Sequence, residues 1–142
     1  MADPGCIFCK IIAGQIPSER VYEDAGAVAF LDIAPLAPGH TLVVPRHHCV
    51  NLLDAPPEAL AACLAAAPRV ARAVLAATGG EGFNFVQFNG SCAGQVVMHL
   101  HFHIIPRRLG DGVTFRWQQG RYREGEMAAL GERVRAALRE GA

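Results

Sequence analysis

The chain has 142 residues with 13 basic and 13 acidic side chains, so its formal net charge is zero, and 51% of its residues are hydrophobic. This length fits one domain over residues 1–142, which would bury roughly 70% of the surface that the unfolded chain exposes. The composition argues against a disordered chain. Because the net charge is zero, overall electrostatic attraction would not concentrate the protein on nucleic acid or on an anionic membrane.

Targeting and cysteine content add two expectations. No apolar run reaches the ~20 residues that a bilayer crossing needs, and the N-terminus lacks a basic-then-apolar signal pattern. The five cysteines are an odd number, so metal binding or plain burial is favoured over a disulfide framework. We therefore expect a cytoplasmic protein that makes no contact with a membrane.

The first part of the chain predicts one short helix and three strands. Residues 6–13 are typical of a short helix, and residues 20–23 and 27–33 of two strands joined as a hairpin by the turn-prone residues 24–26. After a loop rich in proline and glycine, residues 40–45 predict a buried strand that ends at a proline.

The second part predicts a long helix, two strands and a terminal helix. Apolar residues recur every three or four positions over residues 57–78, and Pro68 is expected to kink or split this helix. Strands are expected over residues 83–88 and 96–106, and a last amphipathic helix over residues 126–139. Strands and helices do not alternate regularly, so we expect an α+β fold with an antiparallel sheet.

The last strand carries the strongest chemical signal. Three histidines alternate with apolar residues there: His99, His101 and His103. Period-two alternation sends the imidazoles to one face of the strand and the apolar side chains to the core. Packing alone explains this poorly, because each buried imidazole needs a polar partner. By spacing alone, the three could also hold a catalytic metal with an open fourth position.

The surrounding residues narrow this choice. Several segments together resemble the histidine triad family, over most of residues 6–108. They are residues 6–12, 16–18, 30–33, 37–45, Asn89 with Gly90, and 93–98 before the histidines. The resemblance implies a HIT-like fold with about five antiparallel strands, a short N-terminal helix, one long helix and a C-terminal helix. Residues 109–142 would form a tail and that last helix.

The resemblance also implies a reaction at phosphorus. His101 would be the nucleophile that attacks the α-phosphate of a purine nucleotide and forms a covalent nucleotidyl-histidine, which water then hydrolyses. The backbone carbonyl of His99 would fix the tautomer of His101, and His103 would face the phosphate or the leaving group. No metal is required for this chemistry.

The same resemblance implies the nucleotide contacts. Asp32 would accept hydrogen bonds from the ribose hydroxyls. Asn89 and Gln95 would donate uncharged hydrogen bonds near the phosphate. An apolar base pocket would be lined by four residues: Phe8, Ile16, Phe30 and Ile33. Seen singly, Asp32 would more often be a turn residue, and the four apolar residues are more often core than pocket. For Asn89 and Gln95 the alternative is an ordinary role in a loop.

A structural zinc ion is a second implication. Cys6 and Cys9 have the spacing of half a zinc site. In the family pattern, His48 and His99 complete a closed Cys₂His₂ set, although His47 could replace His48 on spacing alone. Reduced cysteines without a metal are the alternative.

The leaving group and the assembly are less constrained. The segment around Trp117 and the residue Val96 depart from the family pattern near the leaving group. The resemblance implies a nucleoside phosphoramidate hydrolase that forms a homodimer with the long helix at the interface. The alternatives are a dinucleoside polyphosphate hydrolase, a metal-dependent hydrolase, and a nucleotide- or zinc-binding protein without turnover. Nucleic acid is a poorer fit, because the arginines of the tail form only a modest cluster.

Overall fold

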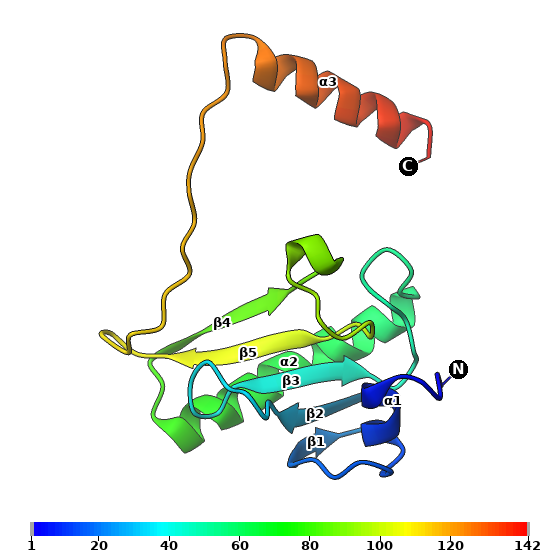
Figure 1. Ribbon diagram of the computed structural model, residues 1–142, viewed down its shortest axis with the longest axis vertical. Coiled ribbons are helices and arrows are strands. Elements are labelled where there is room, and N and C mark those ends of the chain that lie inside the picture. Colours follow the sequence, from blue (N-terminus) through cyan, green and yellow to red (C-terminus); the bar gives the residue numbers. More distant parts are fainter. Residues whose placement is uncertain (1, 142) are drawn as a thin grey trace.

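The computed structural model describes residues 2–141 and shows an α+β protein built on one five-stranded sheet (Figure 1). Every pairing in the sheet is antiparallel, and the strand order is β1-β2-β3-β5-β4. The elements are α1 (Ile7–Ile12), β1 (Arg20–Glu23), β2 (Ala27–Leu31), β3 (Thr41–Pro45), α2 (Pro57–Thr78), β4 (Gly82–Gln87), the 3-10 turn η1 (Ser91–Ala93), β5 (Phe102–Arg107) and α3 (Glu126–Arg139). The predicted fold class and antiparallel sheet are confirmed.

Both faces of the central strands are covered, by a different helix on each side. In Figure 1, α2 lies behind the sheet and α1 in front of it. Alternate residues therefore enter separate clusters, so that Ala29 and Val43 pack with α2, whereas Phe30 and Val44 pack with α1. This explains why β2 and β3 read as continuous apolar runs, since both faces of each strand are buried.

Pro68 was expected to kink or split the long helix. The helix α2 is continuous through this proline, so a split is excluded. Pro68 is exposed, while Ala66, Ala67 and Val70 around it are buried in the core. We attribute the continuity to this packing, which holds both halves against the sheet and offsets the missing backbone hydrogen bond. By length and composition alone α2 could cross a bilayer, contrary to the expectation that no run of the chain is long and apolar enough. Burial of one helix face accounts for the apolar residues found there.

The last strand is shorter than predicted, because β5 begins at Phe102 and not at residue 96. The pairing of β3 with β5 stops at Val43 and Phe102. Two positions further along β3 stands Pro45, which has no N–H with which to continue the ladder. The N–H of Leu100 instead donates to the carbonyl of Cys49 at 2.8 Å. Two of the three histidines therefore lie in an irregular segment before the strand.

The tail after β5 extends away from the sheet and ends in α3, whose bounds agree with the prediction (Figure 1). Its apolar residues are largely exposed: Met127, Leu130, Val134 and Leu138. An isolated helix of 14 residues is marginal in water. The apolar stripe of α3 therefore needs a partner that its own sheet does not provide.

Candidate functional site

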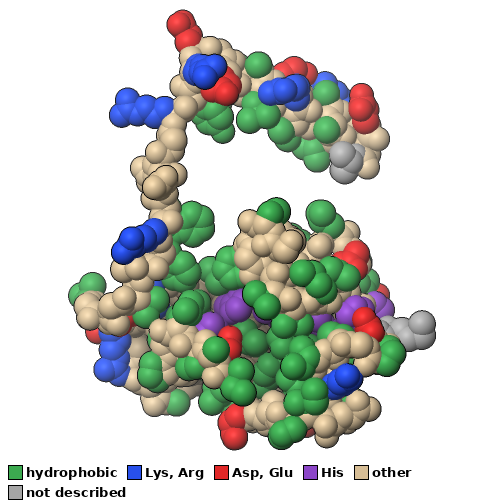
Figure 2. Space-filling view, in the orientation of Figure 1, with side chains coloured by type: hydrophobic (Ala, Val, Ile, Leu, Met, Phe, Trp, Pro, Cys, Tyr) green, Lys and Arg blue, Asp and Glu red, His purple; other side chains and the backbone are tan. Residues whose placement is uncertain are grey.

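The three histidines lie on the sheet face that carries α1, opposite to α2. His103 in β5 pairs with Leu42, and paired residues share a face. The intervening Leu100, Phe102 and Ile104 pack into the core with α2, as the alternation predicted. Figure 2 shows histidine side chains reaching the surface on this face, surrounded by hydrophobic side chains.

The imidazoles do not converge on one point, which argues against a three-histidine metal site. His99 faces two cysteines, His101 binds the backbone of His99, and His103 binds another histidine, His40. Among residues 2–141, the groups of potential metal ligands do not unite the three histidines. The irregular backbone before β5 is what turns His99 away from the other two.

A tetrahedral donor set forms where α1 meets this irregular segment. Cys6, Cys9, His48 and His99 each offer one ligand atom, and these atoms lie within 4.8 Å of one another. The Nδ1 atoms of His48 and His99 are 3.3 Å apart, and the Cys9 sulfur lies 3.4 and 3.6 Å from them. Zinc with ordinary bond lengths and tetrahedral angles separates two nitrogens by about 3.3 Å, and nitrogen from sulfur by about 3.6 Å. The donors therefore fit a closed Cys₂His₂ site.

The surroundings of the two histidine ligands support the same assignment. The Nε2 atom of His99 lies 2.9 Å from the carbonyl oxygen of Pro45. A carbonyl only accepts, so this nitrogen carries the proton and Nδ1 presents its lone pair to the cysteines. The Nε2 atom of His48 lies 3.7 Å from a carboxylate oxygen of Asp3. His47 is exposed and stands outside the cluster.

His101 presents a nucleophilic nitrogen. Its Nδ1 donates to the carbonyl oxygen of His99 at 2.6 Å, which fixes the proton on Nδ1 and leaves a lone pair on Nε2. Burial lowers the pKa of His101, which keeps the ring neutral at pH 7. The ring of Phe8 meets it edge-on at 5.1 Å between centroids. The lone pair has no hydrogen-bond partner within residues 2–141 and is not sealed from solvent.

His103 is held by His40, which in the sequence stands out only as part of the segment of residues 37–45. The backbone N–H of Leu36 donates to His40 Nδ1 at 3.0 Å, and His40 Nε2 lies 2.9 Å from His103 Nδ1. Burial lowers the pKa of both rings, that of His103 to about 4. His40 directly precedes β3, which pairs with β5, so strand register was the signal that could have revealed it.

Asp32 follows β2 and lies beside this pair. One carboxylate oxygen accepts from the backbone N–H of Ala34 at 2.8 Å, and the other lies 3.6 Å from His40 Nε2. The latter distance is too long for a hydrogen bond, so that oxygen remains available to another donor.

The residues predicted to line a base pocket differ in exposure. Phe8 and Phe30 are buried and meet edge-on at 5.4 Å, and Ile16 packs against their cluster. Ile33 is fully exposed at 100% and follows the end of β2, although it was expected to be the last residue of the strand. Its side chain contributes nothing to the core.

Asn89 and Gln95 hold loops together. The amide of Gln95 is buried, accepts from Gly90 N–H at 2.8 Å and donates to the carbonyls of Val50 and Val97. Asn89 accepts from the backbone N–H of Leu52 at 2.8 Å. In this structure their side chains therefore shape the segments that flank the histidines.

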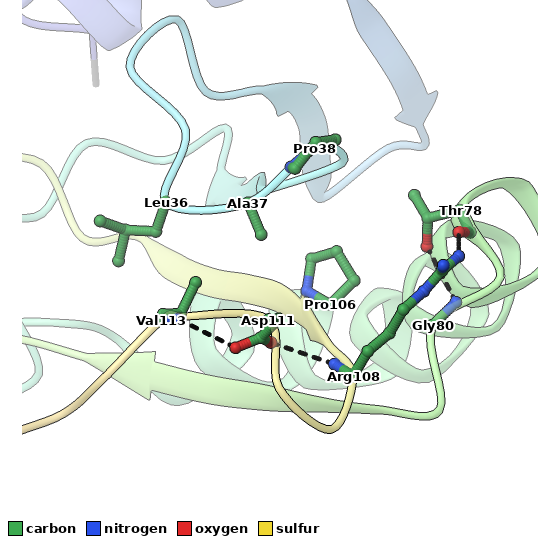
Figure 3. Close-up of a pocket in the computed structure, with 9 residues that line it drawn as sticks. All are labelled: Leu36, Ala37, Pro38, Thr78, Gly80, Pro106, Arg108, Asp111 and Val113. Atoms are coloured by element: carbon green, nitrogen blue, oxygen red, sulfur yellow. Dashed lines mark hydrogen bonds between the residues drawn. The ribbon is translucent and has the colours of Figure 1, made fainter.

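A cavity of about 330 Å³ lies away from these residues, where the tail leaves β5 (Figure 3). Asp111 closes a turn there by accepting from the backbone of Arg108 and Val113, and the side chain of Arg108 reaches the carbonyl of Thr78. None of the predicted site residues lines it. The cavity is bounded by the contacts that fix the start of the tail.

Comparisons with known proteins match both the sequence and the fold of this chain. The HIT domain family profile matches residues 13–110. The chain is 38% identical over 135 residues to adenosine 5′-monophosphoramidase hnt1 of Schizosaccharomyces pombe, covering 94% of this chain and 98% of the relative. The crystal structure of SMU.412c from Streptococcus mutans matches with a TM-score of 0.91 and 39% identity, covering 96% and 87% of the two chains.

A second solved structure bears on the metal. The structure of a Zn-bound histidine triad family protein from Mycobacterium smegmatis matches with a TM-score of 0.75 and 41% identity. The match covers 93% of this chain and 97% of the other.

Proposed function

Since the chain belongs to the HIT domain family and is a hydrolase of that family, we propose that it hydrolyses purine nucleoside phosphoramidates and releases the nucleoside monophosphate. The observation that carries this proposal is the pair formed by His101 and His103. One ring offers a free Nε2 lone pair, and the ring beside it, at 5.0 Å between centroids, is held by a separate hydrogen bond. A nucleophile next to a polar group is what displacement at phosphorus requires.

The reaction proceeds in two displacements. The Nε2 lone pair of His101 bonds to the α-phosphorus while the bond from phosphorus to the leaving nitrogen breaks. That nitrogen keeps the electron pair and takes one proton from water. The remaining hydroxide then attacks phosphorus, the bond to His101 breaks with its electron pair returning to Nε2, and the monophosphate leaves. The sum is one water consumed for each phosphoramidate cleaved.

The residues around the pair would bind the nucleotide. The free carboxylate oxygen of Asp32 would accept from the ribose hydroxyls. Phe8, Phe30, Ile16 and Ile33 would bury the purine by apolar contact. Asn89 and Gln95 would place their loops, and with them backbone donors, beside the phosphate.

We also propose that the Cys₂His₂ cluster binds structural zinc. A closed four-ligand site leaves no position for water, so zinc would supply structural cross-linking and no chemistry. His99 links the two sites, because its ring is a ligand while its carbonyl holds the nucleophile.

We also propose that the chain forms a homodimer, a proposal that the free edge of the sheet supports. β4 is an edge strand with exposed Phe83 and Phe85, and Leu64 of the neighbouring α2 is exposed too. The tail, residues 109–142, would reach across to the partner. A match to SMU.412c at a TM-score of 0.91 over 96% of the chain includes this tail, which supports its extended position.

We expect Phe83→Asp to convert the dimer into a monomer, because a charge on this edge would be desolvated at the interface. Val21→Asp is the matched control, since Val21 is similarly exposed on β1 at the opposite edge. Sedimentation equilibrium measures both. A wild-type chain that sediments at 15.1 kDa would contradict the proposal.

Release of AMP from adenosine 5′-phosphoramidate tests the proposed activity, with a diadenosine polyphosphate assayed in parallel. We expect the phosphoramidate to be preferred at least tenfold in kcat/KM, and brief exposure to a chelator to leave turnover intact. Preference for the dinucleotide would assign the chain to that substrate class. Turnover of neither substrate would indicate a binding protein. Immediate loss on chelation without unfolding would show metal-dependent hydrolysis.

A further inference from the structure

A chain of three hydrogen-bonding groups ends at His103 and determines which of its nitrogens carries the proton. It begins at the backbone N–H of Leu36, which donates to His40 Nδ1 at 3.0 Å. A backbone N–H can only donate, so Nδ1 of His40 is unprotonated and its proton lies on Nε2. That N–H faces His103 Nδ1 at 2.9 Å and must donate to it. His103 therefore carries its own proton on Nε2.

The same reasoning excludes a metal at this cluster, although Asp32, His40 and His103 lie close enough to hold one. A metal on His40 Nε2 would move the ring proton to Nδ1. That proton would then point at the Leu36 N–H, and two donors would face each other. The geometry of the cluster instead places the proton of His40 on Nε2, where it faces His103.

Burial makes this arrangement durable. His40 is 3% exposed and half-buried His103 packs against Phe88 and His101, so the pair is held without competing water on most sides. Asp32 lies 3.6 Å from His40 Nε2 and favours a proton on that nitrogen by charge alone.

We propose that His40 is a positioning residue that locks His103 as an Nε2–H donor toward the leaving group; this assignment of its target rests on the proposed function. With the opposite tautomer, His103 would present a lone pair to a phosphate or to a leaving nitrogen that gains negative charge, and the contact would be repulsive. The Nε2–H instead stabilises that nitrogen as the bond from phosphorus breaks. Leu36 acts through its backbone, so its side chain is irrelevant to this role.

The tautomer is measured directly by long-range ¹H–¹⁵N correlation on the full chain labelled at histidine, with the His103 signals assigned by their loss in His103→Gln. We expect Nε2–H at His103 in the wild type. His40→Gln keeps an amide N–H for His103 and should keep this tautomer. His40→Phe keeps an apolar ring without a donor and should shift His103 to a mixture or to Nδ1–H.

Kinetics test the target of the donor. In His40→Phe we expect kcat for adenosine 5′-phosphoramidate to fall about 10- to 100-fold with KM little changed, as for a lost hydrogen bond to the charge that develops on the leaving nitrogen. The p-nitrophenyl ester of AMP has a leaving group that needs no such help, so its turnover should change less than about threefold. His40→Gln should recover most of the loss.

Two results would overturn the inference. One is a wild-type His103 in the Nδ1–H form, or a tautomer that His40→Phe leaves unchanged. The other is an equal loss for both substrates, which would remove the leaving group as the target. The spectra need no substrate, so failure of the proposed activity in the wild type would not be confused with failure of the proton arrangement. Thermal unfolding of His40→Gln checks that the fold survives.

Discussion

Replacing His101 with alanine is expected to lower kcat/KM for adenosine 5′-phosphoramidate by about 10⁴-fold or more, because covalent catalysis has no substitute for its nucleophile. No other imidazole can take over. His99 Nδ1 faces the cysteines and its Nε2 is bound to Pro45, while His103 carries its proton on the nitrogen left open. AMP affinity should change little, since the residues proposed to contact the base and the ribose remain.

The covalent adduct gives this prediction a second measurement. Rapid quenching of the wild type in alkaline denaturant, followed by mass spectrometry, should show one adenylyl group on the peptide that contains His101. His47→Ala is the matched control, because His47 is exposed and outside both clusters. More than a tenth of wild-type activity in His101→Ala, or an adduct elsewhere, would contradict the assignment.

The sequence predicted most of the fold because its signals were local. The period of α2 and α3, the turn at residues 24–26 and the proline that ends β3 are each set by neighbours along the chain, and those elements were placed to within about two residues. The misjudged start of β5 has a different origin. It depends on the end of the β3–β5 pairing at Val43 and Phe102 and on the hydrogen bond from Leu100 N–H to the Cys49 carbonyl, which joins segments far apart in the sequence and which no local pattern records.

The candidate site followed the same division. Spacing and resemblance indicated the four metal donors, and the structure brings them together. His40 was overlooked because its role depends on two partners from different segments, Leu36 four residues before it and His103 on another strand. Which nitrogen of His103 carries the proton depends on all three groups, so it can be inferred only from their arrangement in the folded chain.

The metal prediction has the second largest expected effect. Cys9→Ser should reduce bound zinc from one per chain to near zero, because Cys9 lies against both histidine ligands and a serine hydroxyl is a poor replacement for a thiolate. We expect Tm to fall by about 5 to 10 °C, which corresponds to a loss of ~2–3 kcal/mol in the free energy of unfolding for a domain of this size. Atomic absorption and calorimetry measure the two effects.

The link through His99 makes this variant informative about catalysis as well. When one of the four proposed metal donors is missing, the ring of His99 is held less firmly. The backbone carbonyl of His99, which accepts from His101 Nδ1, is then positioned less precisely. We therefore expect kcat to fall about tenfold, far less than in His101→Ala, because the nucleophile is misplaced and not removed. Cys92→Ser is the matched control, since Cys92 is exposed and outside the cluster. Full zinc content in Cys9→Ser would refute the ligand assignment, and a loss as large as that of His101→Ala would show that the metal takes part in the chemistry itself.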